Sequence, residues 1–541
     1  MQKELQLKVN EKNLLANLRH AFTDRMTVAS ELMQNARRAG ASRVEIAFDE
    51  AAQTLTVSDD GCGIADLQNL LTVAESGWDQ ATKDRENPYG LGFLSGMYAC
   101  DFVHVASRGT LTVLDTKKLL AGEAGASESS PVMTDKTIIS LVGFAGTVAE
   151  VQGRVEKFAC GYALPVFFND QEIERPDALD NGLFVETEVG MMSVYGIHRG
   201  EAGSCGDSMY GYLQGHRVLS DRHYRATDRT VIHFDPTKFH GRMPDRNCLV
   251  DAEAAQKQVK EVHTRLWREH LRERFAAMSP EDFVRTYLNA TRKFTPELLN
   301  ELDFIPTEFL AQAEDYPIIS DQASFSPHNK PFPVRREDLE SGRVTLYAEP
   351  EDLYEEGNSS RDWMFLYAKK ALVLQKSLPE GHWAIPHLID LTDDGVGLEL
   401  IEPGKVGTFS GRYICQADVQ LCAAYKLISP QAGEVVIEDD AIYDPERGFV
   451  VPAGECYGEA VRQVSSYIDE NDCFDDECCD QDKDEMTNLL CRLRTDSPEA
   501  FFAEVLKKIN LKWVTGADQQ LFGKAFRVEV SPEGRVIVAA A

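Results

Sequence analysis

The sequence lacks the features that would place it in a membrane or a secretory compartment. No apolar run in its 541 residues approaches the roughly 20 residues that a membrane-spanning helix needs. Its opening segment, residues 1–10, is polar and charged, so we expect no signal peptide and a cytoplasmic location. The length is sufficient for roughly three or four domains with their own hydrophobic cores.

Metal-binding spacings are also missing. Four of the twelve cysteines cluster at 473–491 without the Cys-x-x-Cys pairs of a zinc ribbon, so we expect free thiols rather than a zinc site. The surrounding acidic run, 469–485, has no glycine where a calcium-binding EF-hand loop requires one. A solvated linker or a partner-binding acidic loop is the expectation for this segment.

Basic residues are scarce, and the net charge is −32. Residues 1–275 hold 31 basic and 39 acidic side chains, whereas the remainder holds 25 and 49. An acidic surface repels phosphate backbones, which disfavours nucleic acid as a partner. The segment 217–246 is locally basic, so nucleic acid binding stays open there.

A polar pair lies within the helix expected at about 26–39. The apolar residues of this helix recur at helical spacing: Val28, Leu32, Ala36 and Ala39. Glu31 and Asn35 are four residues apart and therefore share another face. A carboxylate there can orient and deprotonate a water, and an amide oxygen beside it can complete the shell of an Mg²⁺ ion. The alternative is an ordinary exposed polar face.

Two glycine-rich turns come next. The strand expected at 55–59 ends in Asp59-Asp-Gly61-Cys-Gly63, where the Asp59 carboxylate could accept a hydrogen bond from an adenine amino group; an ordinary Asp-Gly hairpin is the alternative. Gly90-Leu91-Gly92-Phe93 then opens a helix, and backbone N–H groups at such a helix start can bind phosphate. It is neither a Walker A loop nor a Rossmann fingerprint. The polar stretch between Gly77 and Asn87 indicates a mobile lid.

With Gly146-Thr147, these motifs resemble in order and spacing those of the GHKL ATPase superfamily, which comprises gyrase, the ninety-kilodalton heat-shock chaperone, histidine kinases and MutL. Residues 90–107 are similar to the heat-shock chaperone, whereas 35–46 and 59–64 look more like MutL. The resemblance covers about residues 20–150. It implies an α+β protein that begins with a Bergerat-type ATP-binding sandwich, a mixed sheet with helices on one face.

The same resemblance assigns roles. Glu31 would be the general base and Asn35 would hold Mg²⁺, while Asp59 and Thr147 would read adenine. The remaining residues expected to bind ATP are those of the glycine turns: Gly61, Gly63, Gly90, Leu91, Gly92 and Phe93.

Over residues 156–275 we expect several strands, the first at 165–169, and then a long helix from about 251 to 275. Their order resembles the ribosomal-S5-like transducer domain of MutL and gyrase. There, a basic side chain from a loop before the last helix reaches the γ-phosphate. Arg246 is the first candidate for this role and Lys238 the second. Surface charges on a substrate-facing loop are the alternative reading of both.

The C-terminal half resembles no family that we recognise. We expect a helical connector at 276–335, a mainly β domain at 336–456, and a helical segment at 457–541 with the acidic loop and a terminal hairpin. Strands are expected within the β domain, among them one at 363–367.

The functional expectation is an Mg²⁺-dependent ATPase that works as an ATP-gated homodimeric clamp, chaperone-like or remodelling a protein client. A helix expected at 11–21 would supply part of the dimer contact, as in the relatives. One alternative is a DNA-transaction ATPase of the MutL or topoisomerase kind. The other is a nucleotide-sensing switch in a larger complex.

Overall fold

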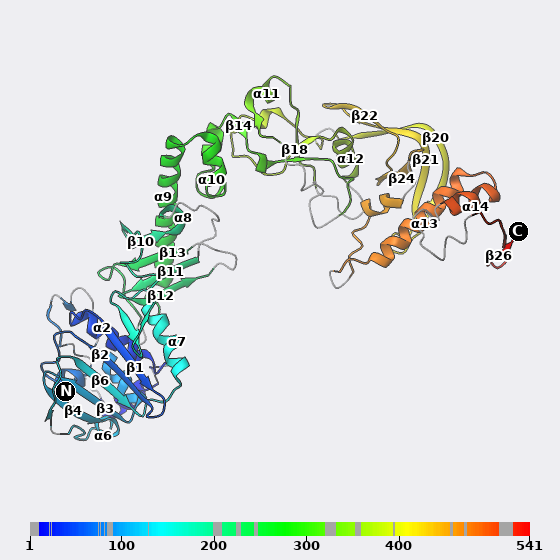
Figure 1. The fold of residues 1–541 in the computed structure, drawn as a ribbon. Coiled ribbons are helices and arrows are strands. Elements are labelled where there is room, and N and C mark those ends of the chain that lie inside the picture. Colours follow the sequence, from blue (N-terminus) through cyan, green and yellow to red (C-terminus); the bar gives the residue numbers. More distant parts are fainter. Residues whose placement is uncertain are drawn as a thin grey trace, which may run out of the picture. The chain divides into compact units, whose positions relative to one another are not determined.

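A computed structural model describes the chain except for residues 1–9, 21, 23, 74, 76, 81, 84–89, 128, 199–207, 223–228, 243–246, 320–331, 352–358, 393–394, 455–457, 470–472 and 508–522. The chain divides into two compact units, Met1–Leu298 and Leu299–Ala541. Both mix helices with mixed sheets, so the α+β class is confirmed (Figure 1).

The first unit begins with a sheet whose described strands follow the order β5-β4-β3-β6-β2-β1-β7-β8. The strands are β1 (Val44–Asp49), β2 (Thr54–Asp59), β3 (Phe102–Ser107), β4 (Thr110–Asp115), β5 (Ser130–Pro131), β6 (Thr137–Val142), β7 (Val166–Phe168) and β8 (Gln171–Ile173). β1 pairs parallel with β7 and antiparallel with β2, so the sheet is mixed. Side chains of β1 alternate between buried and more exposed, as a sheet with one covered face requires.

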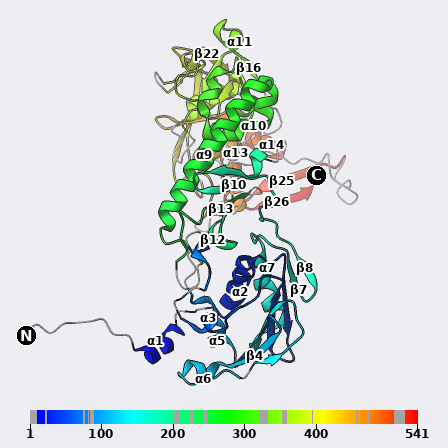
Figure 2. The same ribbon diagram turned by 90° about the vertical axis from the view of Figure 1, so that its left-hand side faces the viewer.

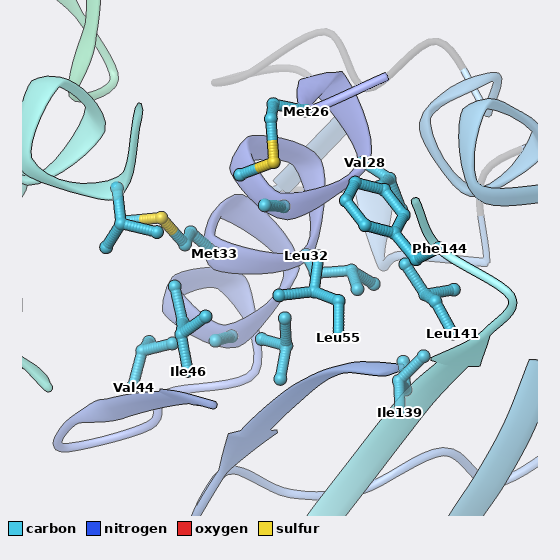
Figure 3. Packing of buried hydrophobic residues seen from close by; sticks show 14 of the residues in the cluster. Met26, Val28, Leu32, Met33, Val44, Ile46, Leu55, Ile139, Leu141 and Phe144 are labelled. Atoms are coloured by element: carbon cyan, nitrogen blue, oxygen red, sulfur yellow. The ribbon is translucent and has the colours of Figure 1, made fainter. Parts of the chain in front are cut away.

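Helices pack on this sheet around one hydrophobic core. They are α1 (Glu11–Leu18), α2 (Thr27–Arg38), α3 (Gln68–Leu71), α5 (Gly92–Ala99), α6 (Thr116–Leu120) and α7 (Val148–Ala159). α2 contacts β2, α5 contacts β3, and α7 contacts β1; α2 and α7 lie side by side (Figure 2). Figure 3 shows Val28 and Leu32 of α2 above Leu55, Ile139 and Leu141 of the sheet. Of the apolar stripe predicted for α2, Val28, Leu32 and Ala36 thus face the core, whereas Ala39 caps the helix and lines the cavity described below.

The first sheet extends further along the chain than expected. The strand predicted at 165–169 is present as β7, but it joins the first sheet instead of the second, with Val166 opposite Val44. A parallel partner for β1 needs a crossover connection, and α7 is positioned to serve as that crossover. The first sheet thus continues past residue 155, where the second domain was expected to begin.

A second sheet follows, in the order β12-β11-β13-β10-β9 over its described strands. Its elements are β9 (Val185–Thr187), β10 (Gly190–Val194), α8 (Tyr195–His198), β11 (Ser208–Leu213), β12 (His216–Asp221) and β13 (Arg229–Phe234). The expected long helix is present as α9 (Ala252–Ala277). The next helix, α10 (Pro280–Phe294), begins with an N-cap, in which Ser279 accepts from the Asp282 N–H. Trp267 of α9 stacks on Phe294 of α10 in the core of this part.

The second unit contains several small sheets. The strands of the first part are β14 (Phe304–Ile305), β15 (Leu310–Gln312), β16 (Val334–Arg335), β17 (Leu346–Ala348), β18 (Leu372–Leu374) and β19 (Leu388–Ile389), with helices α11 (Arg336–Glu340) and α12 (Ser360–Lys369). The later part contains β20 (Gly397–Phe409), β21 (Ala417–Ser429), β22 (Gly433–Ile437), β23 (Ile442–Asp444), β24 (Gly448–Val451), α13 (Asp476–Arg494), α14 (Pro498–Lys507), β25 (Phe526–Val530) and β26 (Val536–Ala540). The terminal hairpin β25–β26 was predicted. Short 3-10 turns lie at Pro296–Glu301, Thr307–Phe309, Ile385–His387 and Gly458–Gln463.

Two expectations for this unit were wrong. The segment at 363–367 is helical, within α12, because its apolar residues continue a buried face that begins at Ser360, and Lys370 ends the helix in the left-handed conformation. Within the acidic run at 469–485, which we expected to be a loop, the second part from Asp476 onward belongs to helix α13, and Asp475 accepts from the Cys478 N–H at the helix start. In the described part of the chain, no His, Cys, Asp or Glu cluster fits a metal, and no helix is long and apolar enough to cross a bilayer.

Candidate nucleotide-binding site

A cavity of about 330 Å³ opens between α2, α3, α5 and the edge formed by the ends of β2, β3 and β6. Such a volume is in the range of small-molecule sites. Its described lining includes Glu31, Leu32, Asn35, Arg38, Ala39, Val57, Asp59, Cys62, Gly63, Ile64, Ala65, Asp66, Asn69, Leu70, Glu75, Gly77, Trp78, Asp79, Gly90, Gly92, Phe93, Arg108, Thr137 and Ile139. The structure thus brings together the polar pair of α2 and both glycine turns.

Glu31 lies where α2 meets the start of α5. Its side chain is only 5% exposed. Gly92 is directly opposite: a β-carbon there would lie 2.8 Å from Glu31 Cδ and 2.9 Å from its Cγ, closer than real contacts come. The missing side chain at position 92 therefore leaves the space that the Glu31 carboxylate occupies.

Asn35 lies one turn further along α2. Its Oδ1 accepts a hydrogen bond from Arg38 Nη1 at 3.2 Å. Arg38 also lines the cavity and is half-buried. An amide oxygen in this position can ligate a hard cation such as Mg²⁺.

Asp59 occupies the end of β2, near the other wall. Burial raises the pKa of its carboxyl group, and the Gly61 N–H, which donates to Oδ1 at 2.9 Å, opposes part of that rise. Gly61 itself is not among the described lining residues. Instead, it packs against the end of α2, where any side chain would collide with Ala39.

The structure places Thr147 elsewhere. Its hydroxyl accepts from the Glu150 N–H at 3.3 Å while the Glu150 carboxylate accepts from the Thr147 N–H at 3.1 Å, a capping box at the start of α7. Thr147 does not line the described cavity wall; Thr137 does, directly across from Asp59 in the β2–β6 register. A polar residue opening the alternating strand Thr137–Val142 was the signal in the sequence that could have indicated it.

The glycine turns have the backbone conformations that require glycine. Gly63 and Gly90 have φ of +76° and +68°, and a β-carbon at Gly90 would collide with the Glu75 backbone. Phe93 lines the cavity, whereas Leu91 precedes α5 and does not belong to the described wall.

Two further residues of the cavity wall are Trp78 and Arg108. The sequence placed Trp78 in the stretch expected as a lid, but it gave no role to Arg108, which directly follows the recognised segment 90–107. Arg108 donates to the Cys62 carbonyl from Nε at 3.1 Å and Nη2 at 2.9 Å, which holds the turn that carries Gly63. Only the folded chain shows that the Arg108 side chain reaches this turn.

Of the two basic residues expected to contact the γ-phosphate, the structure describes Lys238 but not Arg246. Lys238 Nζ donates to the Glu188 carbonyl at 3.1 Å and pairs with Asp235 at 3.3 Å, and it is not part of the described cavity wall. Arg246 lies outside the described residues. The assignment of a γ-phosphate contact to either stays a prediction.

The back of α2 contacts the turn between β11 and β12. Gln34 Nε2 donates to the Gln214 carbonyl, and Ser30 Oγ lies 3.4 Å from His216 Nδ1. Tyr162 also donates to the Met33 carbonyl. One helix therefore presents Glu31 and Asn35 to the cavity and its other face to the second sheet.

The fold of the N-terminal domain, a mixed sheet covered by helices, is the one that the GHKL resemblance implies. A family model described as "Histidine kinase-, DNA gyrase B-, and HSP90-like ATPase" matches residues 24–135, so this domain is similar to the GHKL ATPase superfamily.

Curated relatives are proteins named "Chaperone protein HtpG". That of Verminephrobacter eiseniae is 21% identical over 385 residues, 62% of this chain and 56% of the relative. That of Acinetobacter baylyi is 24% identical over 172 residues, 27% of each chain. That of Vibrio campbellii is 37% identical over 78 residues, 12% of each chain. The chain thus spans at most a little over half the length of these relatives.

Proposed function

We propose that this protein binds ATP in the cavity and hydrolyses it with Glu31 as the general base. The observation that carries the proposal is the meeting of Glu31 and Asn35 with Gly90 and Gly92 along one wall, with Asp59 on the other. Phosphates would lie at the glycine turn and the start of α5, and adenine beside Asp59.

In this mechanism Asp59 accepts a hydrogen bond from the adenine amino group, and Thr137 is positioned beside it to contact the base. Asn35 would hold Mg²⁺, because amide and carboxylate oxygens are the ligands this ion prefers and the cavity offers both. When bound, Mg²⁺ neutralises phosphate charge. Glu31, buried beside the glycine turn, orients a water and accepts its proton as the water attacks the terminal phosphate.

The work done with ATP is proposed to be that of a dimeric clamp on a protein client, chaperone-like or remodelling. The HtpG relatives and the acidic C-terminal half support a protein client over nucleic acid. Two arginines of the locally basic segment already have partners within the chain: Arg217 lies over the Tyr210 ring, and Arg229 pairs with Asp177 at 3.1 Å. ATP would favour the closed clamp only if it binds that form better than the open one. Arg246, or Lys238 after leaving Glu188, would sense the γ-phosphate.

Steady-state ATP hydrolysis by the wild type and by Glu31→Ala, each with and without DNA, tests the proposal. We expect hydrolysis to fall by about 10²-fold or more in the variant, while nucleotide binding is retained. Glu172→Ala, at an exposed position of β8, is the matched control and should behave as wild type. Wild-type turnover in Glu31→Ala would refute the assignment. Stimulation by DNA would favour a DNA-transaction ATPase, and absence of turnover in every protein would favour a nucleotide-sensing switch.

A further inference from the structure

The cavity carries more negative than positive charge. Its described lining contributes the carboxylates of Glu31, Asp59, Asp66, Glu75 and Asp79 and the guanidinium groups of Arg38 and Arg108. A triphosphate that enters this cavity is repelled by these carboxylates unless a cation lies close to the phosphate oxygens. The positions of the two arginines therefore matter for nucleotide binding.

Arg108 and Arg38 are held differently. Arg108 is engaged through two nitrogens with the Cys62 carbonyl, and its stem packs on Gly63. Arg38, on the last turn of α2, donates from Nη1 to the Asn35 amide oxygen at 3.2 Å. That bond brings a guanidinium beside the very oxygen that would hold the metal, on the helix that also carries Glu31.

A guanidinium and Mg²⁺ compete for the Asn35 oxygen. Both are cations that seek its lone pairs, and two positive charges sharing one oxygen repel each other. A phosphate oxygen is the better acceptor for arginine, since its charge strengthens the bond and its geometry suits the planar donor fork.

Resting on the ATP-binding function proposed above, we propose that Arg38 is a nucleotide-contacting residue that moves its hydrogen bond from Asn35 to a nucleotide phosphate on binding, leaving Asn35 for the metal. Arg38 thereby supplies a cation for the phosphates even before Mg²⁺ arrives. Nucleotide binding should then persist in part without metal, and it should depend on Arg38 most when the metal is absent.

The test is the affinity for ADP, measured by calorimetry on the full chain in excess Mg²⁺ and in EDTA. We compare wild type, Arg38→Gln, Arg38→Lys and the control Arg43→Gln. Arg43 is half-exposed, pairs with Glu45 and does not line the described cavity, so its variant removes the same charge outside the site.

We expect Arg38→Gln to weaken ADP binding by about tenfold or more in EDTA, the worth of a charge-assisted hydrogen bond, and by less in Mg²⁺. Arg38→Lys should recover part of the loss, and Arg43→Gln should match wild type. An equal loss under both conditions would assign Arg38 a merely structural role and overturn the proposal, as would no loss in EDTA. Failure of the wild type to bind ADP under either condition would instead overturn the proposed function itself.

Discussion

Replacement of Gly92 by alanine isolates the position of the general base from the rest of the site. The added methyl group would lie 2.8 Å from Glu31 Cδ, so the buried carboxylate must turn or shift to make room. Displacing a reacting group by about 1 Å costs about 10²-fold in rate. We therefore expect kcat for ATP hydrolysis to fall by about 10²-fold, or about 2.7 kcal/mol in the barrier.

The stability of this variant should change far less. Crowding a packed site costs about 1–3 kcal/mol. Replacing a helical glycine returns about 0.5–1 kcal/mol through the unfolded chain. Because the two effects oppose each other, the protein should stay folded, with ADP affinity within a few-fold of wild type.

Two other glycines provide controls, one in the same helix as Gly92 and one in α7. At Gly96 of α5 a β-carbon would lie 2.8 Å from Val28 Cγ2, so Gly96→Ala crowds the core without touching Glu31. At Gly153 of α7 it would meet nothing within 4 Å. Gly96→Ala should lower the melting temperature but keep kcat per folded molecule, and Gly153→Ala should keep both. Wild-type kcat in Gly92→Ala would refute the reasoning, as would an equal loss of kcat in Gly96→Ala.

Two further predictions concern the adenine end of the cavity. Asp59→Asn should abolish ADP binding in calorimetry, yet it should raise the melting temperature at neutral pH. Burial raises the folded-state pKa of Asp59 above its ordinary 3.8, so ionisation of this carboxyl group lowers the stability of the wild type as the pH rises. The advantage of asparagine should therefore vanish below about pH 3.8, where the carboxyl group is protonated in both states. An unchanged ADP affinity would contradict the site assignment. Thr137→Val should weaken ADP binding by roughly 2–10-fold, the worth of one hydrogen bond. Thr147→Val should leave the ADP affinity unchanged and lower the free energy of unfolding by about 0.5–2 kcal/mol, because the α7 cap is lost. The reverse pattern would assign the adenine contact to Thr147.

The sequence was sufficient for those parts of the site that depend on local spacing. Glu31 and Asn35 share a helix face whatever surrounds them, and Gly63 and Gly90 have the positive φ that their turns demand. Partners distant in sequence could not be predicted in this way. The strand at β7 was recognisable as a strand, but its pairing with β1 depends on where α7 returns the chain.

The same limit applies to individual residues. Gly146-Thr147 suits a ligand contact and a helix cap equally well, and only the folded chain shows the cap with Glu150. The short apolar run at 363–367 fits a strand or a buried helix, since five residues are too few for the periodicity to decide. The position of the Arg38 guanidinium beside Asn35 could not be predicted from the sequence, because it depends on the side-chain conformation of Arg38.

Helix α2 offers a physical route by which nucleotide could influence the second sheet. Glu31 and Asn35 face the cavity, while Gln34, between them in sequence, is 2% exposed and donates to the Gln214 carbonyl of the β11–β12 turn. Because a helix moves as a rigid body, a shift of α2 that accommodates metal at Asn35 must also move Gln34. The turn must then follow, or the hydrogen bond must break and leave a buried amide without that partner, at a cost of about 1–3 kcal/mol. With nucleotide bound as proposed, its binding and the position of the second sheet would be coupled through this contact, together with the one between Ser30 and His216.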